Sequence, residues 1–141
     1  MLVINQVEEM LLKTVLFACV ENSFRSQIAE AYFKKFAPKE WIAFSAGIKP
    51  AAKVHPNAVL LMKEEGIDIS DRKPQILTKE LQVKANVAVI VCGSGECPVV
   101  YAKHVESWNM PDPAKMSLEE ARKVRDAIKS KVLSLIEKLK Q

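Results

Sequence analysis

The chain has 141 residues, which is enough for one domain and hardly for two. Apolar residues make up 49% of the chain and charged residues 27%, a balance that excludes a disordered chain, a collagen or a membrane-embedded helical bundle. The net charge is +4, but the basic residues are mostly scattered lysines, and only 6% of the residues are aromatic. We therefore expect a globular protein that binds neither nucleic acid nor a membrane.

The N-terminus lacks the features of a secretory signal, because Glu8 and Glu9 precede the first long apolar run and Lys13 interrupts it. Three cysteines are too few, and odd in number, for a disulfide-stapled secreted domain. These features predict a cytoplasmic protein, whose thiols stay reduced unless they do redox chemistry.

The first half of the chain alternates helical and extended patterns. The continuous apolar run TVLFA is typical of a strand that is buried on both faces, and Pro38 ends the helical pattern that follows it. The expected elements are a short helix at 5–13, a strand at 14–18, a helix at 25–36 and a strand at 41–46.

The second half continues this alternation. The run ANVAVIV is the strongest strand signal in the chain, and Ser117 with Glu120 forms a capping box ahead of a long helical pattern. The expected elements are a helix that begins at Pro56, a short helix at 78–83, a strand at 85–91, a weaker strand at 104–108 and a final helix from Ser117.

This order of elements predicts an α/β fold with a parallel sheet and helices on both faces. We expect one three-layer α/β/α domain with four strands at 13–141, preceded by a helical extension at 1–12. Ligands bind at the carboxyl ends of the strands in such folds, so four loops should meet at one mouth. These are the loops that follow residues 18, 46, 91 and 109.

The first of these loops predicts an anion site. Cys19 ends the buried strand and Arg25 opens the next helix, whose N-terminus attracts negative charge. Arg25 can bind a tetrahedral oxyanion through two hydrogen bonds, and the same positive field favours Cys19 as a thiolate nucleophile. Backbone N–H groups between the two residues can turn inward; they belong to Val20, Glu21, Asn22, Ser23 and Phe24.

Two neighbouring side chains support the same interpretation. The hydroxyl of Ser26 can donate to the sulfur of Cys19, and the side chain of Asn22 can hold the loop in shape. The alternative is a buried cysteine that precedes an arginine by chance, which the spacing alone does not exclude. The strand before the loop and the helix after it favour a site.

The segment VLFACVENSFRSQIAEAYF (15–33) resembles the phosphate-binding loop of low-molecular-weight tyrosine phosphatases and of the arsenate reductases that share their fold. Four further segments resemble the arsenate reductase branch in the same order: SAGI (45–48), HPNAV (55–59), GIDIS (66–70) and WNMPDPA (108–114). The resemblance covers residues 13 to 139 and implies the low-molecular-weight tyrosine phosphatase fold.

Oxygen loss from a bound oxyanion needs a general acid at the mouth. Asp112 is the candidate because it follows the last strand and lies between two prolines that stiffen the backbone. The alternative is an aspartate that only shapes a turn. The resemblance favours Asp112 as the acid over Asp68 and Asp71.

A second thiol loop separates the two branches of the family. A phosphatase needs one cysteine, yet Cys92 and Cys97 follow the strongest strand signal, with Gly93 and Gly95 between them to let the backbone bend. Two inert core thiols, or a regulatory disulfide on a phosphatase, are the alternatives. A zinc site is a weaker one, because no ligand spacing supports it.

The resemblance implies a catalytic cycle for arsenate reduction. Cys19 attacks the arsenic of arsenate, Asp112 protonates the departing oxygen, and Cys92 attacks Cys19 to release arsenite. Cys97 then forms a disulfide with Cys92, and thioredoxin or a similar dithiol protein restores the thiols. No metal or organic cofactor is implied, and we expect a monomer.

Two features bear on this assignment. The two later cysteines lie closer together than in the better-known thioredoxin-coupled reductases, which leaves the order of Cys92 and Cys97 open. Some members of the family hold a potassium ion near the loop, and Asn22 and Glu30 fit part of such a site. A tyrosine phosphatase, or a non-catalytic oxyanion or redox sensor, remains an alternative to the reductase.

Overall fold

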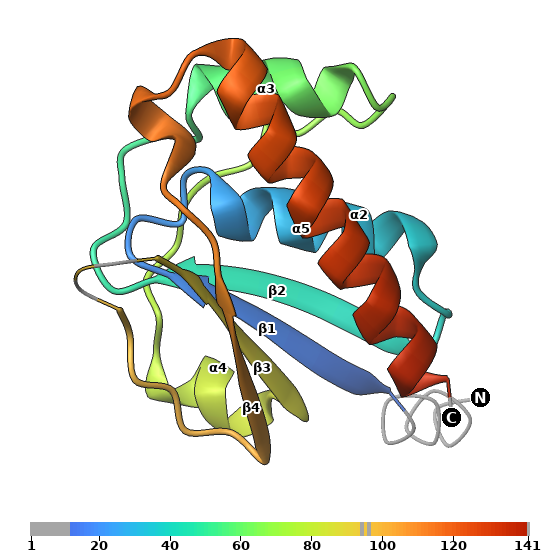
Figure 1. Ribbon diagram of the computed structural model, residues 1–141. Coiled ribbons are helices and arrows are strands. Elements are labelled where there is room, and N and C mark those ends of the chain that lie inside the picture. The colour runs from blue at the N-terminus through green and yellow to red at the C-terminus, as the bar shows by residue number, and fades with distance from the viewer. Residues whose placement is uncertain (1–11, 94, 96, 141) are drawn as a thin grey trace.

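The computed structural model describes residues 12–93, 95 and 97–140. Its centre is the predicted four-stranded parallel sheet, with strand order β2-β1-β3-β4 (Figure 1). The strands are β1 (Lys13–Cys19), β2 (Trp41–Gly47), β3 (Val87–Cys92) and β4 (His104–Asn109). Because all four strands are parallel, their carboxyl ends lie at the same edge of the sheet.

Helices cover both faces of the sheet, but unequally (Figure 1). Three of them pack on one face: α2 (Arg25–Phe36), α3 (Pro56–Lys63) and α5 (Leu118–Leu139). The short α4 (Lys79–Lys84) lies on the other face, and the 3-10 turn η1 (Pro113–Lys115) precedes α5. The predicted three-layer α/β/α architecture is therefore confirmed.

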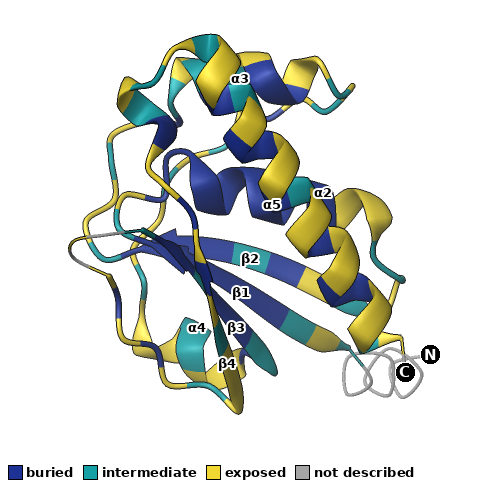
Figure 2. Cartoon of the chain, viewed as in Figure 1, coloured by how far each residue is buried: buried dark blue, intermediate teal, exposed yellow. Residues whose placement is uncertain are grey.

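The alternation of side chains along β1 explains the two layers. Val15 and Phe17 point into the larger core beneath α2 and α5, whereas Leu16 and Ala18 point into the smaller core beside α4. All four side chains are fully buried, which explains why the sequence is apolar without interruption from Val15 to Ala18 (Figure 2).

Local signals place the ends of several helices as expected. Ser117 and Glu120 form the predicted capping box at the start of α5. Pro56 occupies the first turn of α3, and the ring nitrogen of His55 accepts a hydrogen bond from the N–H of Asn57. No helix among the described residues is long and apolar enough to cross a membrane.

Some predicted boundaries were wrong. Lys13 belongs to β1 and not to the expected leading helix, most of which falls outside the described residues. The strand expected from residue 85 begins at Val87, because Ala85 ends α4 and Asn86 bonds β1 across the connection: its Oδ1 accepts from the N–H of Thr14 at 2.8 Å.

Candidate active site

The loop between β1 and α2 is held from outside by the segment 48–55. Four N–H groups of that segment donate to carbonyl oxygens of the loop, over 2.8 to 3.3 Å. The pairs are Ile48 to Cys19, Lys49 to Val20, Ala51 to Glu21 and His55 to Ser23. In a trans peptide the next N–H points opposite to the carbonyl, so the loop turns its N–H groups inward around a concavity, an arrangement that can bind an anion.

The sulfur of Cys19 lies inside this concavity. The thiol is unbonded to another cysteine, and the residue is only 3% exposed. Its Sγ lies 2.9 Å from Oγ of Ser26 and accepts a hydrogen bond from the N–H of Asn22 at 3.1 Å. Both contacts stabilise negative charge on the sulfur.

Asn22 organises the loop from its centre. It is fully buried and adopts a left-handed backbone conformation with φ of 53°. Its Nδ2 donates to Oγ of Ser26 at 2.8 Å, so the hydroxyl hydrogen of Ser26 is left to donate to Cys19. Its Oδ1 accepts from the N–H of Gln75 at 2.9 Å and from Nε2 of Gln27 at 3.2 Å.

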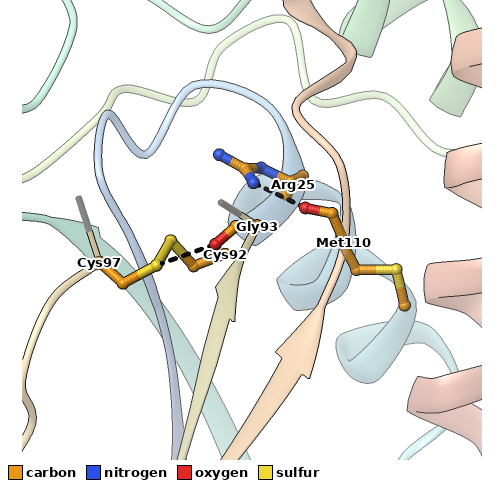
Figure 3. The surroundings of a disulfide bond; sticks show 5 residues. All are labelled: Arg25, Cys92, Gly93, Cys97 and Met110. Atoms are coloured by element: carbon orange, nitrogen blue, oxygen red, sulfur yellow. Dashed lines mark hydrogen bonds between the residues drawn. A yellow bond between two sulfur atoms is a disulfide. The ribbon is translucent and has the colours of Figure 1, made fainter. Parts of the chain in front are cut away.

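Arg25 opens α2 beside the loop, and its side chain crosses to the end of β4. One guanidinium nitrogen donates to the carbonyl oxygen of Met110 at 2.9 Å (Figure 3). This hydrogen bond uses one of the five N–H donors of the guanidinium. The arginine is thus positioned by backbone that leads directly to Asp112.

A cavity of about 260 Å³ brings the predicted groups together. It is smaller than the roughly 300–1,000 Å³ of pockets that enclose drug-sized ligands, and therefore suits a small anion. Its lining consists of Cys19, residues 20–24 of the loop, Arg25, Cys92 and Asp112. Three of the four expected loops, those after residues 18, 91 and 109, therefore line one cavity, whereas the loop after residue 46 packs against the first of them from outside.

Asp112 has both features expected of it: it shapes a turn, and it lies in the wall of the cavity. Its Oδ1 accepts from the N–H of Ala114 at 3.0 Å and so caps η1, and its side chain also lines the cavity. Asp68 and Asp71 do not line this cavity. Asp68 instead accepts from Ser70, and these hydrogen bonds hold the pKa of its carboxyl below the usual range. A carboxyl of that kind is a poor proton donor.

Cys92 and Cys97 form a disulfide bond, with Cα atoms 5.9 Å apart (Figure 3). Cys92 ends β3 and is buried, whereas Cys97 is exposed. The Sγ of Cys97 lies 3.3 Å from the carbonyl oxygen of Gly93, and Gly93 packs against the backbone of Met110. Cys92 thus lies in the wall of the cavity with Cys97 bonded to it, and four intervening residues are enough to close the bond.

Comparison with known proteins places these observations in a family. Residues 14–141 match the family described as low molecular weight phosphotyrosine protein phosphatase. The chain belongs to this family.

Within this family, several proteins that are similar to the chain are named arsenate reductases. An arsenate reductase of Brevibacillus brevis is 41% identical over 129 residues, covering 89% of this chain and 95% of the relative. A solved structure of an arsenate reductase in the oxidized state superposes with a TM-score of 0.79, at 34% identity, over 90% of this chain and 98% of the other. A thioredoxin-dependent arsenate reductase of Corynebacterium glutamicum superposes with a TM-score of 0.75, at 29% identity, over 92% of this chain and 64% of its own.

The potassium site of some members of the phosphatase family does not fit this chain. The carboxylate of Glu30 is 1% exposed and already pairs with Arg72 and with Lys34, whose Nζ lies 2.6 Å away. Its other oxygen accepts from the hydroxyl of Ser45. Asn22 Oδ1 accepts two N–H donors, as described above. Among the described residues no group of three His, Cys, Asp or Glu side chains could hold a metal ion.

The sequence did not predict the groups from elsewhere in the chain that support the loop between β1 and α2. Gln75 contacts Asn22, the carbonyl of Met110 positions Arg25, and the backbone at Gly47 lies directly behind the loop. Gln75 and Met110 contribute backbone atoms, which leave no mark on residue identity. The segments SAGI and HPNAV contain Gly47 and His55, and their resemblance to the family was the one signal in the sequence that pointed to this supporting region.

Proposed function

We propose that this protein is a thiol-dependent arsenate reductase. One observation carries the proposal: the cavity that contains Cys19, Arg25 and Asp112 also has Cys92 in its wall, and Cys92 is bonded to Cys97. Hydrolysis of a phosphate ester needs only the one nucleophilic thiol, whereas arsenate reduction needs a second thiol within reach of it. The arsenate reductases among the relatives support the same choice.

The first step is attack on a bound oxyanion. The inward N–H groups of the loop and Arg25 bind the oxygens of arsenate, and the Cys19 thiolate attacks arsenic. An arsenic–oxygen bond breaks, and Asp112 supplies a proton so that the oxygen leaves as water. Arsenic is then attached to the sulfur of Cys19 and is still pentavalent.

The second step transfers two electrons. The thiolate of Cys92 attacks the sulfur of Cys19, a disulfide forms, and the bonding pair of the sulfur–arsenic bond stays on arsenic. Arsenic is thereby reduced to the trivalent state and leaves as arsenite. Cys92 is assigned this role because it lines the cavity with Cys19.

Cys97 completes the relay from outside. Its thiolate attacks the sulfur of Cys92, which frees the Cys19 thiolate and forms the Cys92–Cys97 disulfide of this structure. Because Cys97 is the exposed sulfur of the pair, a protein dithiol can attack it directly. We assign this reductant to thioredoxin or a similar dithiol protein of the cytoplasm, and the enzyme acts as a monomer without a bound cofactor.

A second candidate is a low-molecular-weight protein tyrosine phosphatase that hydrolyses aryl phosphates through a phosphocysteine. The family match and the loop favour it, because Cys19, Arg25 and Asp112 are sufficient for that chemistry. Cys92 and Cys97 would then act as a redox brake on the phosphatase.

One set of assays separates the two candidates. Arsenate-dependent oxidation of thioredoxin and hydrolysis of an aryl phosphate are measured for the wild type, Cys92→Ser and Cys97→Ser. We expect both variants to lose catalytic arsenate turnover, by about a hundredfold or more, because the relay then lacks one thiol. Aryl phosphate hydrolysis by the same variants should persist and serves as the control for an intact loop.

One outcome would reject the three-cysteine relay, and another would reject the reductase itself. Full arsenate turnover in both serine variants would remove the relay. Efficient aryl phosphate hydrolysis by the reduced wild type, together with no arsenate turnover, would favour the phosphatase. Turnover of either arsenate or an aryl phosphate would reject a non-catalytic oxyanion or redox sensor.

A further inference from the structure

A buried carboxylate lies beneath the anion loop, residues 19–25 between β1 and α2. Glu30 is one helical turn after Ser26 on α2, so both side chains project from the same face of the helix. Glu30 is 1% exposed. A negative charge at this depth repels an oxyanion in the loop unless positive charge compensates it, because the interior screens weakly.

The compensating charges come from two different places. Lys34 is on the same helix, four residues later, and its side chain is 46% exposed. Arg72 comes from the segment between α3 and α4 and donates a hydrogen bond to Oε2 of Glu30. Arg72 is therefore the cation that joins the buried carboxylate to a distant part of the chain.

The segment that carries Arg72 also contacts the anion loop directly. Three residues after Arg72, the N–H of Gln75 donates to Asn22 Oδ1 at 2.9 Å, and Nε2 of Gln75 donates to the carbonyl of Ser45 at 2.8 Å. The carbonyl of Gln75 accepts from the N–H of Gly47 at 2.9 Å. Loss of the Arg72–Glu30 pair would thus affect both the charge and the anchoring of the loop.

We infer that the guanidinium of Arg72 compensates the negative charge of Glu30 and positions the anion loop, so that no added monovalent cation is needed for either. The inference rests on the proposed oxyanion site. Arg72 acts through Glu30 and Gln75, so it is a positioning residue and touches no substrate. The misfit of a potassium ion at Glu30 and Asn22 follows from the same contacts.

The first arm of the test needs no variant. Binding of inorganic phosphate to the reduced wild type is measured in potassium chloride and in choline chloride at equal ionic strength. We expect the same dissociation constant in both salts, and the same KM for arsenate. A several-fold weaker affinity in choline would overturn the inference, because it would show that the loop requires an added cation.

The second arm compares Arg72→Met, Arg72→Lys and the control Arg122→Met. Arg122 of α5 pairs with Glu64, which follows α3, and neither residue lines the cavity. We expect Arg72→Met to bind phosphate about tenfold more weakly, with a parallel rise in the KM for arsenate and little change in kcat. Arg72→Lys keeps the charge and should stay within about threefold of the wild type, as should the control.

The outcomes separate this inference from the proposed function. Wild-type affinity in Arg72→Met, or an equal loss in Arg72→Lys and Arg72→Met, would overturn the role of the Arg72 charge while leaving the reductase intact. A wild type that binds no phosphate would instead remove the oxyanion site, and this inference with it. Thermal unfolding of each variant shows whether it is folded at the assay temperature.

Discussion

At the scale of single residues, the anion loop depends on the absence of a side chain at Gly47. A Cβ there would lie 2.5 Å from the carbonyl oxygen of Val20 and 2.9 Å from the nitrogen of Asn22. Both atoms are backbone and belong to the loop, so neither can rotate away as a side chain would. Glycine lets β2 support the loop from behind at a distance that no other residue allows.

We therefore expect Gly47→Ala to displace the loop. The overlap should destabilise the fold by about 1–3 kcal/mol, measured by denaturant unfolding. A loop displacement of this kind should lower arsenate turnover by about a hundredfold, measured with thioredoxin as reductant.

Gly66→Ala is the matched control for this prediction. Gly66 has φ of 74°, and a Cβ there would have no heavy atom within 4 Å. The substitution should cost about 1 kcal/mol through backbone conformation and leave turnover unchanged. Equal turnover in the two alanine variants would contradict the close approach of β2 to the loop.

At the scale of elements, a charged cluster joins the three helices on one face of the sheet. Glu64 follows α3 and accepts from Arg122 of α5 at 2.8 and 2.9 Å, and from Arg125 at 2.6 Å. Beside it, the hydroxyl of Tyr32 on α2 donates to Glu65 at 2.8 Å. Burial and this hydrogen bond raise the pKa of Tyr32 well above its ordinary value.

The cluster predicts a specific dependence of stability on pH. Hydrogen bonds from Arg122 and Arg125 lower the pKa of Glu64 from 4.5 to about 2. A carboxyl whose pKa is lower in the folded protein stabilises the fold above its unfolded pKa, and this contribution disappears as the pH falls through its folded pKa. The stabilisation by Glu64 should therefore be complete above pH 4.5 and lost by about pH 2.

Thermal unfolding of the wild type and Glu64→Gln across this range measures the effect. The wild type should unfold at the higher temperature at pH 7, and the difference should shrink between pH 4.5 and about pH 2. Measurements below the folded pKa of Glu64 are an internal control, because both proteins then carry a neutral group at this position. A difference that stays constant with pH would contradict the ion pairs with α5.

At the scale of the whole molecule, one small anion would bind groups from distant parts of the chain. The loop after β1 provides the N–H groups, Arg25 begins α2, and Met110 after β4 holds Arg25 in place. The parallel sheet makes this possible because it brings all four carboxyl ends to one edge. Ligand binding should therefore stabilise the fold as a unit.

Phosphate should raise the unfolding temperature of the reduced protein. At a hundred times the dissociation constant the gain is about 2.7 kcal/mol. For a domain of this size that corresponds to roughly 10 °C in a thermal melt.

Arg25→Gln should lose most of this shift, because it removes the charged ligand of the anion. Arg122→Gln retains Arg25 and should keep the shift, which makes it the matched control. The same upward shift in both variants would show that phosphate stabilises the protein somewhere other than this loop.

Much of the fold and part of the site could be predicted from the sequence, because their signals are local. The bounds of α2 at Arg25–Phe36 agree with its apolar spacing and with Pro38, and the capping box at Ser117 marks the start of α5. Cys19, Arg25 and Ser26 lie close together in the sequence, from the end of β1 to the first turn of α2, so their spacing is itself the motif. Asp112 and Cys92 needed the additional rule that parallel strands end at one edge.

Tertiary structure alone decided what surrounds and supports these residues. The carbonyl of Met110 that holds Arg25, the N–H groups of 48–55 that turn the loop, and the pairing of Arg72 with Glu30 join segments far apart in the chain. The first two are backbone groups, which every residue has, and the third joins side chains 42 positions apart. The sequence by itself determined the chemistry of the loop, because that chemistry resides in adjacent side chains. The folded chain decided its geometry, because contacts between distant segments exist only once the sheet has formed.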